Sequence, residues 1–207
     1  MTLDKQPPLL LATGNRGKVV ELSEMLEPHG IEVVGLDQFS GINEVEEIGT
    51  TFIENAKLKA VGYARQTGLV ALADDSGLEV AALDGRPGVL SARYGGDATS
   101  FPQKIEMLLG EVAASVTADR GARFVCAMVI AKPDGTIVGE TEGVCSGKLA
   151  ESPRGHGGFG YDPIFIPDGF EETFGELSSA KKAQISHRAR AFSQIMPILR
   201  DFYGILT

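Results

Sequence analysis

The chain has 207 residues, of which 43% are apolar and 23% are charged, and its formal net charge at pH 7 is −9. A chain of this size can bury a substantial core without disulfide or metal staples. The negative charge disfavours a nucleic-acid partner, because duplex binding depends on neutralising phosphates with lysine and arginine. The longest apolar run, Phe124 to Ala131, is too short to span a bilayer, and residues 1–8 lack the apolar stretch of a secretory signal. We therefore expect a cytoplasmic protein with no membrane partner.

The N-terminal half alternates strand and helix patterns. A short apolar run at 9–13 precedes a helix with apolar residues at helical spacing up to Leu26, and a strand follows at 31–36. Thr51 and Glu54 form a capping-box pattern that starts a helix running to about Gln66. A buried strand at 69–73 then ends in two aspartates.

The C-terminal half is richer in strands. The pattern predicts a helix at 101–112 and strands near 122–131, 136–142 and 143–149 that form a meander. A glycine-rich loop at 155–160 leads into a strand at 161–166, and a last helix starts at Ser186. This order indicates an α/β or α+β fold with a mixed sheet and a cleft. We expect one domain over 1–207, with 1–8 as a loosely ordered extension.

The first candidate motif lies between an apolar strand and an amphipathic helix. Glycines allow close approach of a ligand, the helix start favours an anion, and Lys18 adds a positive charge. The Walker A spacing is absent, so an ordinary strand–turn–helix junction is the alternative. The motif reads Thr13-Gly14-Asn15-Arg16-Gly17-Lys18.

Acidic residues form the second and third candidates. Asp74 and Asp75 follow a buried strand, where two carboxylates are costly unless a cation neutralises them. Alternation along an extended chain allows one to face a metal while the other is held by backbone or lysine; a surface turn is the alternative. The acidic segment 44–49 could supply a second carboxylate to Mg²⁺, or be a solvated loop. Asn55 and Lys59 share one helical face, which could point into a cleft or into solvent.

Two further motifs lie near the C-terminus. Phe159 and Tyr161 among glycines suit stacking on a planar base, with Asp162 as a hydrogen-bond acceptor, although glycine-rich turns with buried aromatics are common. Ser186 can cap the last helix, which places His187 and Arg188 in its first turn. A cation such as Arg188 at this position opposes the helix dipole. An anion or a keto-bearing base bound there would satisfy both Arg188 and the dipole.

Taken together, five segments resemble the inosine triphosphate pyrophosphatase family, which hydrolyses non-canonical purine nucleoside triphosphates. The resemblance covers Leu9 to about Phe202, with the motifs in the family's order. They are Thr13–Lys18, Thr51-Phe52-Ile53-Glu54-Asn55-Ala56, Ala73-Asp74-Asp75-Ser76-Gly77-Leu78, Phe159-Gly160-Tyr161-Asp162-Pro163 and Ser186-His187-Arg188.

The resemblance implies a Mg²⁺-dependent enzyme that converts ITP, dITP or XTP to the monophosphate and pyrophosphate. It implies an elongated mixed α/β domain, with two lobes around a central cleft, that forms a homodimer. Asp75 corresponds to the catalytic proton acceptor and metal ligand, and Glu46 to the other metal-binding acid. The implied substrate-binding residues are Thr13, Gly14, Asn15, Arg16, Gly17, Lys18, Ser76, Phe159, Gly160, Tyr161, Asp162, Lys182, His187 and Arg188.

Three other functions fit parts of this pattern. A pyrophosphatase for another nucleotide, such as a modified pyrimidine, would use the same phosphate chemistry. A non-catalytic nucleotide sensor would not need a carboxylate placed for water, which Glu46, Asp74 and Asp75 offer. An RNA-binding module is disfavoured by the net charge.

Overall fold

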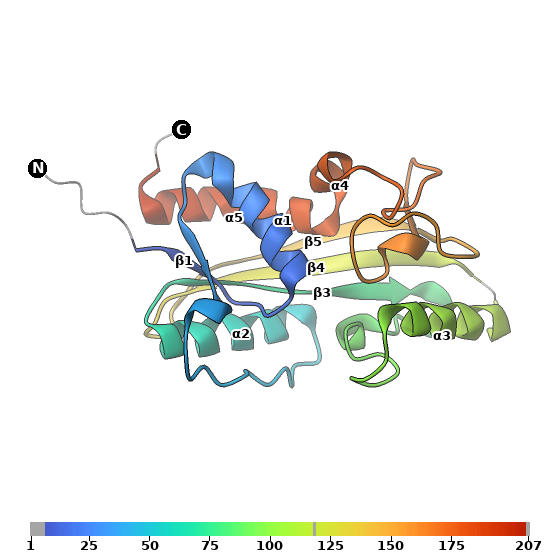
Figure 1. Ribbon diagram of the computed structural model, residues 1–207, viewed down its shortest axis with the longest axis horizontal. Helices are drawn as coiled ribbons and strands as arrows, with labels where there is room; N and C mark the ends of the chain where they lie inside the picture. Colours follow the sequence, from blue (N-terminus) through green and yellow to red (C-terminus); the bar gives the residue numbers. More distant parts are fainter. Residues whose placement is uncertain (1–6, 118, 206–207) are drawn as a thin grey trace, which may run out of the picture. The chain divides into compact units, whose positions relative to one another are not determined.

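One mixed β-sheet carries the fold in the part of the chain that the computed structural model describes, residues 7–117 and 119–205 (Figure 1). Its six strands in these residues are β1 (Leu9–Leu11), β2 (Val33–Gly35), β3 (Ala71–Val80), β4 (Gly121–Ala131), β5 (Ile137–Leu149) and β6 (Phe165–Pro167). The strand order is β2-β1-β3-β4-β5-β6; β1 is parallel to β2 and β3, and β5 is antiparallel to β6. Five α-helices lie in the same described ranges: α1 (Arg16–Leu26), α2 (Phe52–Thr67), α3 (Phe101–Ala114), α4 (Ser179–Ile185) and α5 (His187–Tyr203). The α/β class and the mixed sheet are confirmed.

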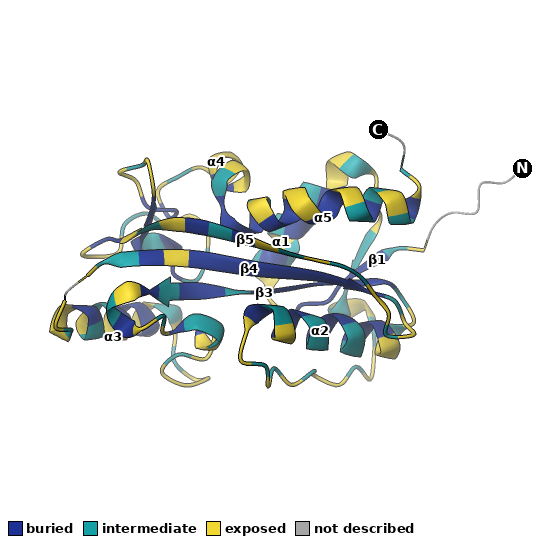
Figure 2. Ribbon diagram, turned by 180° about the vertical axis from the view of Figure 1, so that it is seen from behind, coloured by how far each residue is buried: buried dark blue, intermediate teal, exposed yellow. Residues whose placement is uncertain are grey.

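The chain divides into two compact units. Unit 1 comprises 1–75, 127–142 and 191–207, and unit 2 comprises 76–126 and 143–190. Within unit 1, α2 covers one face of the strands, and α1 and α5 cover the other (Figures 1 and 2). The predicted elongated shape with a cleft between two lobes stays a prediction. Of the predicted N-terminal extension, 1–6 lie outside the described residues.

Two strands form the centre of the core. All of Phe124 to Ala131 in β4 is buried (Figure 2), as is Ala71 to Asp75 in β3. Strands covered on both faces have continuous rather than alternating apolar sequences, which is why both runs were visible in the sequence. The predicted end of a strand at Ala73 is wrong: β3 continues through both aspartates to Val80. Lysines neutralise these carboxylates, so the charges do not end the strand.

The strand-rich half differs from the prediction in three places. The expected strands at 136–142 and 143–149 are one strand, β5. The strand expected at 161–166 begins only at Phe165, because a 3₁₀ turn, Asp162–Ile164, with Pro163 in its first turn, precedes it. The short helix α4 was not predicted. The predicted helices at 101–112 and from Ser186 are confirmed as α3 and α5.

Candidate active site

The turn between β1 and α1 has the predicted strand–turn–helix geometry. The Asn15 side chain caps α1 by accepting hydrogen bonds from the backbone N–H groups of Gly17 and Lys18, at 2.9 and 3.2 Å. The Asn15 N–H in turn donates to Thr13 Oγ1. Gly14, Asn15 and Arg16 are exposed. The Asn15 cap thus occupies two of the backbone N–H groups at this helix start. An anion bound at the turn would depend on the other N–H groups of residues 13–18.

Lys18 reaches from α1 to the first aspartate of β3. Its Nζ lies 2.6 Å from Asp74 Oδ1 and donates to the Asp74 carbonyl oxygen at 3.2 Å. Asp74 is fully buried, and Lys18 is 9% exposed. An isolated carboxylate at this depth would be costly, and Lys18 neutralises it.

The second aspartate pairs with a lysine on α2. Lys59 Nζ lies 2.7 Å from Asp75 Oδ1 and 3.0 Å from Glu47 Oε1. Since α1 and α2 cover opposite faces of unit 1, the consecutive acids are neutralised from opposite sides, as strand alternation predicts. Sequence reasoning left Lys59 undecided between cleft and solvent, and it lies against Asp75.

Asp75 keeps one oxygen available. Its Oδ2 is buried and has no hydrogen-bond partner among the described residues, and the whole residue is 6% exposed. Burial raises the pKa of the Asp75 carboxyl, against the opposing charges of Lys59 and Lys18. Burial also acts to lower the pKa of Lys59, but the charges of Asp75 and Glu47 outweigh it and leave that pKa raised. A fixed carboxylate with one buried, unpaired oxygen is suited to accept a proton or a cation.

The predicted metal ligand Glu46 lies apart from this network. Glu46 is exposed, and its neighbour Glu47 is the acid that contacts Lys59. Within the described residues, no group of three or more His, Cys, Asp or Glu side chains is arranged to hold a metal ion. The residues still fit Mg²⁺, because this ion takes one or two carboxylates and completes its shell with water and substrate phosphates. Asp75 Oδ2 would supply one such oxygen.

In unit 2, a third buried lysine–aspartate pair organises the glycine-rich loop. Lys182 Nζ lies 2.6 Å from Asp162 Oδ2, and the same oxygen accepts a hydrogen bond from the Phe159 N–H at 2.7 Å. Lys182 Nζ also lies 4.8 Å from the centroid of the Phe159 ring. Gly158 has φ +69°, and a Cβ there would lie 2.0 Å from Asp162 Oδ2. The loop therefore closes on Asp162, which acts as a structural acceptor.

Arg188 and His187 pack next to this loop from the start of α5. Arg188 is 1% exposed; its Nη2 donates to Ser76 Oγ at 3.0 Å, and its Cζ lies 5.7 Å from the Phe159 ring centroid. His187 stacks on Phe124, with ring centroids 4.6 Å apart. Ser186 Oγ accepts from the Ala189 N–H, which confirms the predicted cap. Ser76, Phe159, Lys182 and Arg188 are thus joined by contacts.

Tyr161 does not have the stacking role that the sequence suggested. It is 2% exposed, its hydroxyl donates to the Ser91 carbonyl oxygen, and its ring packs edge-on against Phe101. Only Phe159 of the two aromatics is partly exposed. The aromatic–glycine pattern could not distinguish them, because it gives no depth for either side chain.

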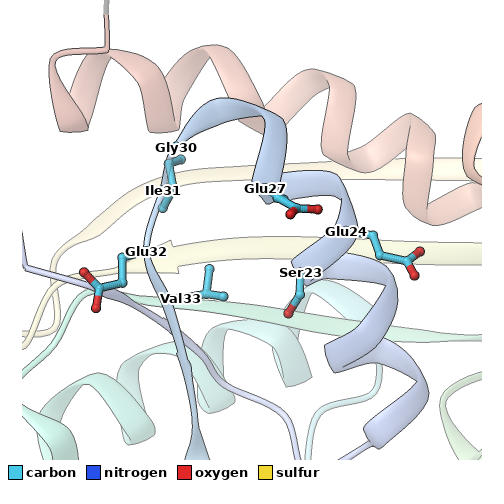
Figure 3. A pocket seen from close by; sticks show the side chains of 7 residues that line it. All are labelled: Ser23, Glu24, Glu27, Gly30, Ile31, Glu32 and Val33. Atoms are coloured by element: carbon cyan, nitrogen blue, oxygen red, sulfur yellow. The ribbon is translucent and has the colours of Figure 1, made fainter.

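A hollow of about 510 Å³ in unit 1 is lined by none of the residues described above, neither those around Asp74 and Asp75 nor those around Asp162 and Arg188. Figure 3 shows it beside the end of α1 and the segment that leads into β2. Three glutamates, Glu24, Glu27 and Glu32, line it together with smaller residues. Acidic side chains alone do not define a site, and we assign it no function.

The fold and these clusters define a class of protein: an α/β protein with lysine-paired buried acids near a strand–turn–helix junction, suited to a phosphate-bearing ligand. The model of the Ham1 family matches residues 9–198, and the chain belongs to this family. This confirms the resemblance that the five motifs predicted. No helix in the described residues is long and apolar enough to cross a membrane.

The relatives cover almost the whole chain. The chain is 47% identical over 195 residues to the dITP/XTP pyrophosphatase of Desulforamulus reducens, covering 94% of this chain and 96% of that protein. It is 45% identical over 200 residues to the dITP/XTP pyrophosphatase of Streptomyces coelicolor, covering 95% and 98%. Among solved structures, a HAM1 protein from Coxiella burnetii matches with TM-score 0.85, 39% identity and coverage of 94% and 98%. The Staphylococcus aureus Ham1 protein matches with TM-score 0.82, 38% identity and coverage of 95% and 100%.

Proposed function

We propose that this chain is a nucleoside triphosphate pyrophosphohydrolase that converts dITP, ITP and XTP to the monophosphate and pyrophosphate. Family membership and the names of its relatives, dITP/XTP pyrophosphatase, support this substrate class. The observation that carries the proposal is the Asp75 carboxylate, which Lys59 holds by one oxygen while the other stays unpaired. A general base must be held in place and must keep an oxygen that no other donor already occupies.

In the proposed reaction, Asp75 orients a water molecule and takes its proton while the water oxygen attacks the α phosphorus. The bond from the α phosphorus to the bridging oxygen breaks, and pyrophosphate leaves. The turn 13–18 and Lys18 hold the polyphosphate. Mg²⁺, when bound, would neutralise phosphate charge, with Asp75 and the predicted Glu46 as ligands and Glu47 as a further oxygen donor. Lys59 holds the Asp75 carboxylate in place through its ion pair with Oδ1.

The unit 2 cluster is proposed to bind the base. The partly exposed Phe159 ring offers a stacking face, and Arg188 and His187 can donate to a 6-keto oxygen. Adenine would place its 6-amino donor against those donors, so it is disfavoured. Lys182 and Asp162 hold the loop that carries Phe159. The proposal extends to the implied properties: a homodimer in the cytoplasm, without a nucleic-acid partner.

A nucleotide panel tests the proposal. The purified chain is incubated with Mg²⁺ and with ITP, dITP, XTP, GTP, ATP or a modified pyrimidine triphosphate, and the products are separated by chromatography. We expect monophosphate and pyrophosphate, with ITP, dITP and XTP preferred and no turnover without a divalent metal. Orthophosphate and a nucleoside diphosphate as primary products would rule out the mechanism. Binding without turnover would indicate a nucleotide sensor instead.

A further inference from the structure

The acidic segment 43–51 runs antiparallel along α2 and is tied to it at regular intervals. Four side chains on one face of α2 contact residues 43, 45, 47 and 49 of the segment in turn, and a fifth contacts residues 50 and 51 at its end. The ties are Gln66 with the backbone of Asn43 (2.8 and 3.1 Å), Tyr63 Oη with the Val45 N–H (3.3 Å), Lys59 with Glu47 (3.0 Å), Asn55 Oδ1 with the Gly49 N–H (2.7 Å) and Glu54 Oε2 with the N–H groups of Thr50 and Thr51 (2.7 and 3.1 Å).

The spacing of the ties has a geometric basis. Residues 55, 59 and 63 lie four apart on α2, which corresponds to about 6.0 Å along a helix. Residues 49, 47 and 45 lie two apart, which corresponds to about 6.6 Å of extended chain. The two repeats nearly match, so one face of α2 can hold every second residue of the segment. The residues between them, Glu44, Glu46 and Ile48, are exposed.

The tie at Glu47 is the only one of these five that reaches the proposed catalytic group. Lys59 Nζ contacts both Glu47 Oε1 and Asp75 Oδ1. The register of the segment on α2 therefore decides which acid lies on the Lys59–Asp75 pair. A slip by one residue would replace Glu47 with Glu46 or Ile48.

Asn55 is the buried tie next to Glu47. It is 0% exposed, whereas Glu54 and Gln66 on the same helix are exposed. Its Oδ1 takes the Gly49 N–H, and its Nδ2 is buried without a hydrogen-bond partner among the described residues. The tie is thus made by the amide oxygen, while the Nδ2 donor is left unsatisfied at a cost in folding free energy. Gly49 fits closely: a Cβ there would lie 2.7 Å from both Asn55 Oδ1 and Glu54 Cβ.

We infer that Asn55 is a positioning residue: through the Gly49 N–H it sets the register that places the Glu47 carboxylate on the Lys59–Asp75 pair. Because this rests on the proposed function, the consequence is a change in the use of the divalent metal. Asn55 does not touch Asp75 in the contacts above and acts through Glu47. Loss of the tie frees Glu47 to move and weakens the oxygen set that a metal–nucleotide complex meets.

The test compares two variants with two matched controls in the full chain. Asn55→Leu removes the tie at nearly constant volume. Gly49→Ala pushes the segment off Asn55, because its Cβ would lie 2.7 Å from Asn55 Oδ1 and from Glu54 Cβ, and it replaces neither Glu47 nor Asp75. Gln66→Leu removes an amide tie from the same helix and segment at the far end. Gly110→Ala adds a methyl group where nothing lies within 4 Å. Each protein is measured for Mn²⁺ affinity, by electron paramagnetic resonance of free Mn²⁺ with an α,β-imido analogue of ITP, for the Mg²⁺ dependence of ITP turnover, and for Tm.

We expect Asn55→Leu and Gly49→Ala to weaken Mn²⁺ binding and raise the half-saturating Mg²⁺ concentration about tenfold. At saturating Mg²⁺ their kcat stays near that of the wild type, and Gln66→Leu and Gly110→Ala match the wild type throughout. The inference is overturned if the Asn55→Leu variant binds Mn²⁺ as tightly as the Gln66→Leu variant. It is also overturned if Asn55→Leu lowers Tm but changes neither Mn²⁺ affinity nor the Mg²⁺ dependence of turnover. If Asn55→Leu does not fold, Gly49→Ala decides by the same criteria. Wild-type protein that fails to hydrolyse ITP overturns the proposed function, and the Mn²⁺ comparison is judged separately.

Discussion

Both units bury lysine–aspartate pairs, and the Lys59–Asp75 pair of unit 1 is used differently from the Lys182–Asp162 pair of unit 2. In unit 2 a single oxygen of Asp162 accepts from both Lys182 and the Phe159 N–H, so the carboxylate closes a loop. In unit 1 Asp75 gives one oxygen to Lys59 and keeps the other buried and unpaired among the described residues. Both acids are almost equally hidden, at 2% and 6% exposure.

The two carboxylates differ in whether one oxygen atom stays without a hydrogen-bond partner, as Asp75 Oδ2 does. Burial alone does not distinguish a structural acid from a reactive one, because both must be neutralised to be tolerated. An unpaired oxygen on an otherwise fixed carboxylate does distinguish them, since it is retained at a cost in folding free energy. We therefore expect changes at Asp75 to alter rate and metal use, and changes at Asp162 and the loop it holds to alter base binding and stability.

The largest expected effect is that of Asp75→Asn, which keeps size and polarity but removes the charge. Turnover of ITP should fall about 10²- to 10⁴-fold, the usual contribution of acid–base catalysis. Because burial raises the pKa of Asp75, the ionised carboxylate disfavours the fold above that pKa. Glu47 remains as a counter-charge for Lys59. Tm at pH 7 without metal should therefore stay equal or rise, and any gain should vanish as the pH falls toward the ordinary value near 3.8.

Asp162→Asn provides the comparison for that result. It weakens a buried pair whose acid has a structural role, so Tm should fall while the metal dependence of turnover stays unchanged. Removing one member of a buried ion pair costs about 3–5 kcal/mol, and the amide should recover part of this. Near-normal turnover in Asp75→Asn would remove Asp75 from the mechanism and break the distinction between the two pairs.

The second effect is that of Lys18→Ala. Losing one charge-assisted phosphate contact costs about 1.5–3 kcal/mol, which raises KM for Mg–ITP about 10- to 150-fold. Lys18 also neutralises the fully buried Asp74. Tm should therefore fall as well. In the double variant with Asp74→Asn, Tm should recover while KM stays high; recovery of both would show that Lys18 acts only through Asp74.

The elements of unit 1 could be predicted from the sequence, and its acid network only in part. Local signals, such as the Asn15 cap and the Thr51–Glu54 box, specify where helices begin. Strand alternation correctly separated Asp74 from Asp75. The choice between Glu46 and Glu47 depends on the register of an irregular segment against α2, which no local pattern reports. Lys59 could have been found from its position four residues after Asn55, on the same face of α2.

In unit 2 the order of the motifs could be predicted from the sequence, but the burial of their side chains could not. Phe159 and Tyr161 flank one glycine, yet one is partly exposed and the other is in the core with its hydroxyl on Ser91. The sequence also suggested Asp162 as a ligand for the base, whereas Lys182 and the loop backbone occupy its Oδ2. These outcomes depend on long-range packing, which the spacing of residues does not contain.

A smaller effect is expected for Phe159→Leu, which tests base binding in unit 2. The ring lies 4.8 Å from Lys182 Nζ and 5.7 Å from Arg188 Cζ, which hold it beside the start of α5. Stacking of the base on this ring contributes about 0.5–1.5 kcal/mol. We therefore expect KM for ITP to rise about 2- to 13-fold, with kcat and the Mg²⁺ dependence unchanged. Phe170→Leu is the matched control, because it removes a similar contact with Lys181 at 5.5 Å. A change in Mg²⁺ dependence in Phe159→Leu would contradict the separation of roles.

The smallest effect concerns Tyr203, where a polar atom is buried without a partner and without chemistry to justify it. Its hydroxyl has no hydrogen-bond partner among the described residues, and burial raises its pKa to about 12. Tyr203→Phe should raise the free energy of unfolding by up to about 1 kcal/mol at pH 7, since it removes an unsatisfied group. The phenol ionises near pH 10 in the unfolded chain but only near 12 in the fold, so wild-type stability should fall over that interval. Thermal melts of both proteins at pH 7 and pH 11 should show a larger drop for the wild type, with equal ITP turnover at pH 7. Equal drops would mean that the hydroxyl is solvated, and an unpaired oxygen would then be weaker evidence for function at Asp75 as well.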